Sequence, residues 1–95
     1  MENKLYLKSE DIVFRKIADE CVLVPIKNNV ADLRSIYSLN PVGARIWELI
    51  DGETSLEQIK KVLHNEFEVT DEQLDKDIKN FTEQLRAIKA IQEVT

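Results

Sequence analysis

The residue types that most often perform chemistry in proteins are scarce in this chain. His64 is the single histidine, and no second histidine or cysteine stands at metal-ligand spacing from it. Cys21, the single cysteine, lies in an apolar run with no histidine nearby in the sequence to activate its thiol. We interpret His64 as a helix-surface residue and Cys21 as a buried, unreactive thiol.

Acidic residues and glycines could bind ions, but both have a simpler interpretation. Neither glycine belongs to a phosphate-binding loop, because Gly43 falls inside a predicted helix and Gly52 ends it. The acidic side chains gather where another helix is predicted to begin, and there they favour the positive end of its dipole. They are Asp71, Glu72, Asp75 and Asp77. The sequence predicts no catalytic residue, no metal site and no cofactor.

Composition indicates one folded, helix-rich domain that spans residues 1–95. A chain of 95 residues can enclose one small core but not two. Hydrophobic residues make up 43% and charged residues 33%, with two glycines and two prolines, which is not the composition of a disordered chain. The net charge of -5 argues against a nucleic-acid partner, because affinity for phosphates comes largely from Lys and Arg.

Cysteine content and hydropathy bear on where the protein works. One cysteine cannot form an internal disulfide, which favours a reducing compartment. The sequence has neither an apolar signal segment near its start nor a run of about 18 apolar residues that could cross a membrane. We therefore expect a cytoplasmic protein without a membrane partner.

Short runs rich in β-branched residues between residues 11 and 39 predict a three-stranded antiparallel sheet. Ile12–Ile17 and Cys21–Ile26 are typical of a hairpin, and Leu33–Leu39 alternates as a third strand. Pro25 lacks a ladder donor, so we expect it near a strand end, at a bulge or where its nitrogen faces no partner. Residues 1–10 are either a further strand or a loose arm.

Three helices are predicted between about residues 41 and 90. The first begins after the N-cap Asn40, and the third after Thr70, which forms a capping box with Gln73. The second begins at a capping box of Thr54 with Glu57 or of Ser55 with Gln58. Residues 91–94 are a short strand or a frayed tail. The predicted fold is α+β, with a small sheet followed by three helices on one side of it.

The edge of the third strand could bind a peptide. An edge strand offers unpaired N–H and C=O groups to an extended chain, and the third helix would supply a side-chain groove beside it. The pattern alone favours this interpretation no more than a second one, in which the N-terminal arm or a dimer partner covers the edge.

The chain from about Tyr37 to Val94 resembles the PqqD family, the peptide chaperones of pyrroloquinoline quinone synthesis, and the wider set of precursor-peptide recognition elements. The residues that carry the resemblance are Tyr37-x-Leu39-Asn40, Ala44-x-Ile46-Trp47-x-Leu49, Asp51-Gly52 and Thr70-x-x-Gln73. The chain departs from the family near the end of the third helix, where Lys89-Ala90 stand in place of a glycine.

The resemblance implies a winged-helix-like, non-catalytic domain that binds the leader of a ribosomally synthesised precursor peptide. It also implies a partner that modifies the peptide, often a radical S-adenosylmethionine enzyme. In such domains the leader adds to the third strand and lies against the third helix. The peptide-binding residues expected here are Leu33, Arg34, Ser35, Ile36, Tyr37, Leu74, Ile78, Phe81 and Leu85, with Lys79 and Arg86 as further basic residues at the rim.

Two other functions fit the pattern of elements. A winged-helix DNA-binding protein should carry a basic recognition helix, but Asp71 to Arg86 holds five acidic and three basic side chains. A purely structural module that forms a homodimer through the same strand edge is the other alternative.

We predict that the chain alone has no catalytic activity, because the sequence brings no nucleophile together with a base and no ligands together around a metal. The isolated protein should leave the mass of its cognate peptide unchanged when the partner enzyme is absent. Mass spectrometry of the incubated peptide checks this, and turnover by the isolated protein would contradict it.

Overall fold

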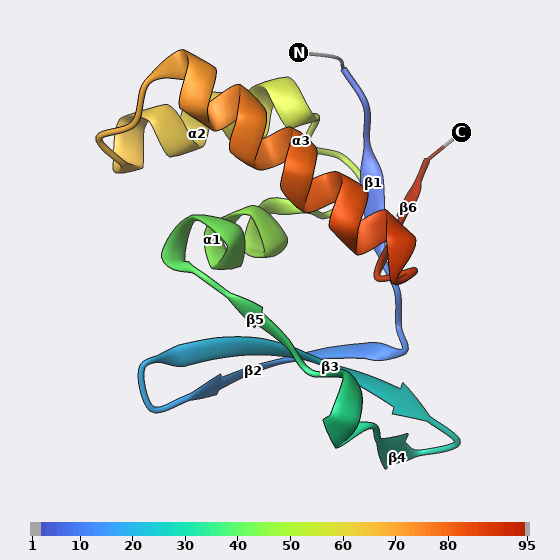
Figure 1. Cartoon of the computed structure of the whole chain (residues 1–95). Helices are drawn as coiled ribbons and strands as arrows, with labels where there is room; N and C mark the ends of the chain where they lie inside the picture. Colours follow the sequence, from blue (N-terminus) through green and yellow to red (C-terminus); the bar gives the residue numbers. More distant parts are fainter. Residues whose placement is uncertain (1–2, 95) are drawn as a thin grey trace.

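The computed structural model describes residues 3–94, which form antiparallel sheets and three α-helices (Figure 1). The α+β fold predicted from the sequence is confirmed. The elements in chain order are β1 (Tyr6–Lys8), β2 (Ile12–Ile17), β3 (Glu20–Lys27), β4 (Val30–Ala31), the 3-10 helix η1 (Leu33–Ser35), β5 (Tyr37–Leu39), α1 (Pro41–Leu49), α2 (Leu56–Glu66), α3 (Asp71–Ala87) and β6 (Ile91–Glu93).

The main sheet is built on β3, which pairs antiparallel with β2, β4 and β5. The predicted hairpin is present, with Ile17 opposite Glu20 and a positive φ of 56° at Ala18 in its turn. Asn28 and Asn29 make the next turn with φ values of 52° and 65°, a conformation that asparagine tolerates better than most residues.

The third strand is shorter than the sequence predicts. Of Leu33–Leu39, only β5 pairs with β3, and η1 takes up the first half. Asp32 begins η1, because its carboxylate accepts hydrogen bonds from the Arg34 N–H at 3.1 Å and from the Ser35 hydroxyl at 3.0 Å. These bonds also lower the pKa of Asp32, the bond from Ser35 most of all.

Pro25 lies opposite this interruption and supplies a reason for it. Its carbonyl accepts a hydrogen bond from the Asp32 N–H at 2.8 Å, but its nitrogen has no hydrogen with which to complete a ladder pair. On either side of this point, β4 and β5 pair with β3 in different registers. The prediction of one continuous strand is therefore wrong. The alternation of side chains in Leu33–Leu39 gives no sign that the neighbouring strand lacks the N–H of Pro25.

The two ends of the described chain meet in a second, two-stranded sheet. β1 pairs antiparallel with β6, with Tyr6 opposite Glu93 and Lys8 opposite Ile91. Of the alternatives left open for both segments, the strand is thus the one observed; residues 1, 2 and 95 lie outside the described residues.

At the turn into β6, a residue other than the expected glycine takes the left-handed backbone conformation. Lys89 has a φ of 60°, and the Ala90 N–H donates to the Leu85 carbonyl at 2.8 Å, as in a Schellman helix end.

Side-chain caps start the helices where the sequence predicts. The Asn40 side chain accepts a hydrogen bond from the Gly43 N–H at 2.7 Å, and Ser55 with Gln58 forms a complete capping box. Thr70 accepts a bond from the Gln73 N–H at 3.2 Å. Each cap satisfies an N–H group that the first turn of a helix leaves unpaired.

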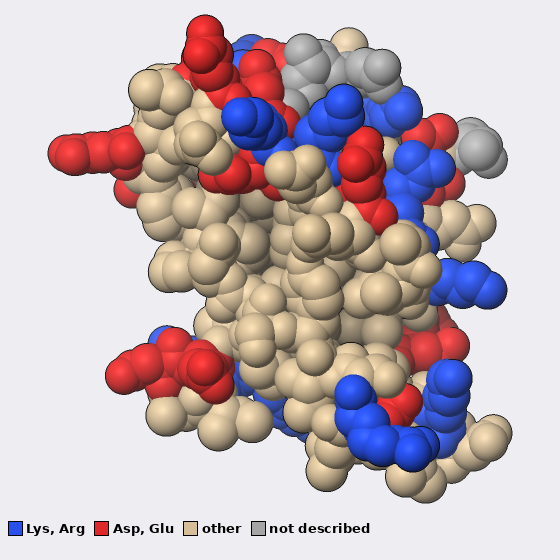
Figure 2. Space-filling view, in the orientation of Figure 1, with Lys and Arg blue, Asp and Glu red and all other residues tan. Residues whose placement is uncertain are grey.

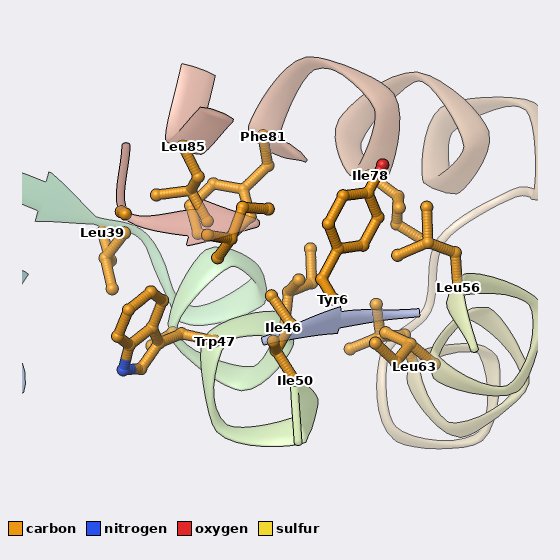
Figure 3. Packing of buried hydrophobic residues seen from close by; sticks show 14 of the residues in the cluster. Tyr6, Leu39, Ile46, Trp47, Ile50, Leu56, Leu63, Ile78, Phe81 and Leu85 are labelled. Carbon is orange, nitrogen blue, oxygen red and sulfur yellow. The ribbon is translucent and has the colours of Figure 1, made fainter. Parts of the chain in front are cut away.

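The core lies between the three helices, the inner face of the main sheet and the β1–β6 ribbon. Figure 3 shows side chains from β1, β5 and all three helices converging on one cluster. The most completely buried large side chains are Leu23, Ile46, Ile50, Ile59, Leu63, Leu74, Ile78 and Leu85. Because α3 contributes three of them, its position relative to the sheet is set by core packing.

Replacing Trp47 by alanine should cost about 3 to 5 kcal/mol of stability, as for other large aromatic core residues. Trp47 is 4% exposed, and the Lys8 ammonium lies 5.2 Å from the centre of its ring. Lys8→Ala is the matched control, since it removes the cation but keeps the ring and should cost only about 0.5 to 1 kcal/mol. Thermal unfolding measures both; an unchanged midpoint for Trp47→Ala would show that the ring does not support the core.

Candidate functional site

A groove lies between β5, the start of α1 and one side of α3. We call it the β5–α3 groove, and its lining residues are Tyr37, Ser38, Leu39, Asn40, Val42, Gly43, Ile46, Asp77, Asn80, Phe81 and Gln84. Its cavity volume is about 180 Å³. Pockets for small molecules usually measure roughly 300 to 1,000 Å³, so this groove suits one or two side chains of a chain that passes over it.

The groove exists because β5 runs directly into α1 while α3 packs across both. Asn40 ends β5 and caps α1, which places the first turn of α1 beside the strand. Gly43 then allows α3 to approach closely, since a β-carbon there would lie 3.3 Å from Phe81 Cε1 and 3.2 Å from Asn40 Oδ1. A larger residue at position 43 would push against the Phe81 ring.

Tyr37 spans one end of the groove from β5 to α3. Its hydroxyl donates a hydrogen bond to Gln84 Oε1, and its ring centre lies 6.4 Å from that of Phe81. Burial raises the pKa of Tyr37, so the hydroxyl stays protonated and able to donate at neutral pH. These contacts join β5 to α3 at that end of the groove.

The direction of the backbone groups in β3 determines which groups of β5 are free. Hydrogen bonds alternate in direction along an antiparallel strand. The Ile26 N–H donates to the Asp11 carbonyl at 2.7 Å on the β2 side, whereas the Pro25 carbonyl accepts from Asp32 on the opposite side. The odd-numbered residues of β3 therefore direct their backbone groups toward β4 and β5.

Ser38 consequently presents its backbone groups outward. Its neighbours Tyr37 and Leu39 lie opposite Leu23 and Cys21, the odd-numbered residues that bond toward β5. Ser38 lies opposite Val22, so its N–H and C=O face away from β3. Among residues 3–94 no other strand pairs with β5. The rim of the β5–α3 groove thus carries an unpaired donor and an unpaired acceptor, both on Ser38.

The face that contains β5 and α3 is mostly uncharged at its centre. Figure 2 shows tan atoms and a hollow in the middle of this face, with Lys, Arg, Asp and Glu gathered mainly along its margins. Such a surface suits a partner whose central contacts are mostly apolar or polar, with most charged groups at the rim.

The residues predicted to bind a peptide fall into three places in the structure. Tyr37 and Phe81 line the β5–α3 groove. Leu74, Ile78 and Leu85 are 0% exposed and form the core beneath it, so the expectation that they contact a peptide is corrected: no surface of these side chains is available to one. The residues that lie on η1 or between η1 and β5, outside the groove lining, are Leu33, Arg34, Ser35 and Ile36.

The basic residues expected at the rim of the peptide site also lie outside the β5–α3 groove. Lys79 and Arg86 line a different hollow of about 370 Å³, together with Lys4, Tyr6 and Leu56. That hollow has a larger volume than the β5–α3 groove, but no residue of β5 lines it. A peptide bound there could not form backbone hydrogen bonds with this strand.

The polar stripe of α3 was missed by the sequence reasoning. Asp77, Asn80 and Gln84 line the groove at helical spacing, one position before Ile78, Phe81 and Leu85. In the sequence these three residues are marked only by their helical spacing beside the apolar residues of α3. That spacing points to a site only when β5 is known to lie beside this side of the helix.

The side chains that could do other chemistry are engaged elsewhere. His64 lies on the exposed surface of α2, 2.7 Å from the Asp71 carboxylate, and Cys21 packs half-buried against the core. In the part of the chain that the structure describes, no group of three or more His, Cys, Asp or Glu side chains could hold a metal ion. None of the helices described is both long and apolar enough to cross a membrane.

Amide hydrogen exchange should reveal the direction of the β5 backbone groups. We expect the Ser38 amide to exchange faster than those of Tyr37 and Leu39, because only the latter two donate to β3. Exchange followed by NMR measures all three amides in one sample. Equal protection of Ser38 and its neighbours would show that its N–H has a partner and is not free to bind a ligand.

Comparison with known proteins agrees with the fold and places the chain in a family. No curated protein matches the sequence. A solved structure described as TbiB1 in complex with the TbiA(beta) leader peptide has 25% sequence identity and a TM-score of 0.71, over 90% of this chain and 93% of that chain. The family described as coenzyme PQQ synthesis protein D (PqqD) matches residues 20–91, from β3 to the first residue of β6. The chain therefore belongs to the PqqD family.

Proposed function

We propose that this protein binds the leader of a ribosomally synthesised precursor peptide and presents it to a modifying enzyme. The observation that carries the proposal is the outward-facing Ser38 backbone beside the β5–α3 groove. Family membership and the similarity to TbiB1, whose structure contains a leader peptide, support the same function.

The leader would add as a strand to β5. Its backbone would exchange hydrogen bonds with Ser38, and this one pair would fix its register. The residue paired with Ser38 would point to the same side as the Ser38 side chain. The residues before and after it would point to the side of Tyr37 and Leu39, toward the helices and the groove.

The chemistry would belong to the partner enzyme. This chain supplies an edge and a groove, and its one histidine and one cysteine lie outside both. We propose a radical S-adenosylmethionine enzyme as the partner and the cytoplasm, where precursor peptides are synthesised, as the place of action.

Self-association is the alternative that the same edge supports, because two copies of β5 could also pair with each other. DNA binding has less support. The groove stripe of α3 contains no Lys or Arg, and α3 carries more acidic than basic side chains.

Replacing Ser38 by proline tests the proposed mode of binding. Proline removes the outward N–H but leaves the bonds from Tyr37 and Leu39 to β3, so the fold should persist. Binding of the leader encoded beside this gene, measured by isothermal titration calorimetry, should weaken by roughly tenfold or more.

Ser38→Ala is the matched control, because it removes the hydroxyl and keeps the N–H, and it should bind normally. Equal affinities for the proline variant and the wild type would contradict strand addition at this edge. Sedimentation of the protein alone completes the test: a dimer that Ser38→Pro dissociates would assign the edge to self-association.

A further inference from the structure

Asp77 is the single charged residue in the lining of the β5–α3 groove. It is half-buried, and its carboxylate accepts one hydrogen bond, from Gln73 Nε2 at 2.8 Å. Across residues 3–94, no Lys or Arg side chain forms an ion pair with it. The groove therefore contains one carboxylate that no Lys or Arg among the described residues pairs with.

Two other aspartates on this part of α3 differ from Asp77. Asp75 lies 2.9 Å from the Lys60 ammonium, and Asp71 lies 2.7 Å from His64. Both pairs connect α3 to α2, on another side of the helix from the groove. Among the described residues Asp77 has no such cationic partner, although it is half-buried and lines the β5–α3 groove.

A peptide that covers the groove would take water away from this carboxylate. A buried charge without a partner is strongly unfavourable, whereas a cation or strong donor from the peptide would restore its interactions. A neutral or acidic peptide side chain at this point would thus be disfavoured, and a basic one favoured.

The position of Asp77 within the groove sets the distance between such a cation and the other side chains of the peptide. Asp77 precedes Gln84 by seven residues, roughly 10 Å along a helix, so the groove has an acidic end and a neutral end closed by Tyr37. Phe81 lies between them, one helical turn from Asp77, and forms an apolar surface with Val42 and Gly43.

We infer that the β5–α3 groove selects peptide segments in which a Lys or Arg stands two residues from an apolar side chain. Alternate residues of an added strand lie about 6.6 to 6.8 Å apart on one face, close to the one-turn separation of Asp77 and Phe81. The apolar side chain would contact Phe81 and the cation would meet Asp77. This inference rests on the proposed function, and it names the chemistry of the leader that the groove accepts.

A displayed library of random twelve-residue peptides tests the inference with the intact protein as bait. Wild-type protein should enrich peptides with the apolar and basic pair at this spacing, and Asp77→Lys should enrich Asp or Glu at the basic position instead. For one enriched synthetic peptide, Asp77→Asn should weaken binding about fivefold and reduce its salt dependence. Asp71→Asn, outside the groove, is the matched control and should change neither the affinity for this peptide nor its salt dependence.

The outcomes separate the inference from the proposed function. Peptides that need the Ser38 edge, shown by loss of binding to Ser38→Pro, but have no basic preference and bind Asp77→Asn normally would overturn the inference and leave strand addition intact. If the library yields no peptide whose binding Ser38→Pro abolishes, both are overturned. Thermal unfolding of each variant confirms that it is folded before its binding is compared.

Discussion

The antiparallel pairing of β5 with β3 is the constraint on which the rest of the molecule depends. Two residue pairs, Cys21 with Leu39 and Leu23 with Tyr37, hold the short strand in place and turn Leu39 into the core. The same pairing delivers Asn40 to the position where it caps α1. It also leaves the backbone of Ser38 facing outward, so one set of hydrogen bonds both closes the fold and creates the edge that can bind a peptide.

α3 shows how one helix serves the core and the groove together. Its buried stripe, which includes Leu74 and Leu85, anchors it against the other helices and the sheet. The adjacent stripe, from Asp77 to Gln84, faces the groove, and a third carries the Asp75 ion pair to α2. Because buried packing fixes the rotation of the helix, the groove residues are held in position before any ligand arrives.

The size of the groove bears on how such a domain could recognise a peptide. β5 contains three residues and exposes one full set of backbone groups, and the cavity beside it accepts one or two side chains. A preformed edge lowers the ordering cost of binding on the protein side, but the added strand must still be ordered. Discrimination between peptides therefore depends on a small number of contacts, and an uncompensated charge among them has a large influence.

The sequence by itself determined the elements whose signals are local. Caps at Asn40, Ser55 and Thr70 lie within three residues of the groups they satisfy, so the helix starts could be predicted closely. The motifs from Tyr37 onward were sufficient to identify the family that the comparison of residues 20–91 then confirmed.

Only the tertiary structure decided the break in the third strand, the outward direction of Ser38 and the stripe of α3 that borders the groove. Each depends on a partner distant in the chain: Pro25 for the break, Val22 for Ser38, and β5 for α3. A shift of one residue in strand register would reverse which backbone groups are free, although the alternation of side chains in the sequence would look the same. The site could therefore be predicted to its strand and helix, but not to its residues.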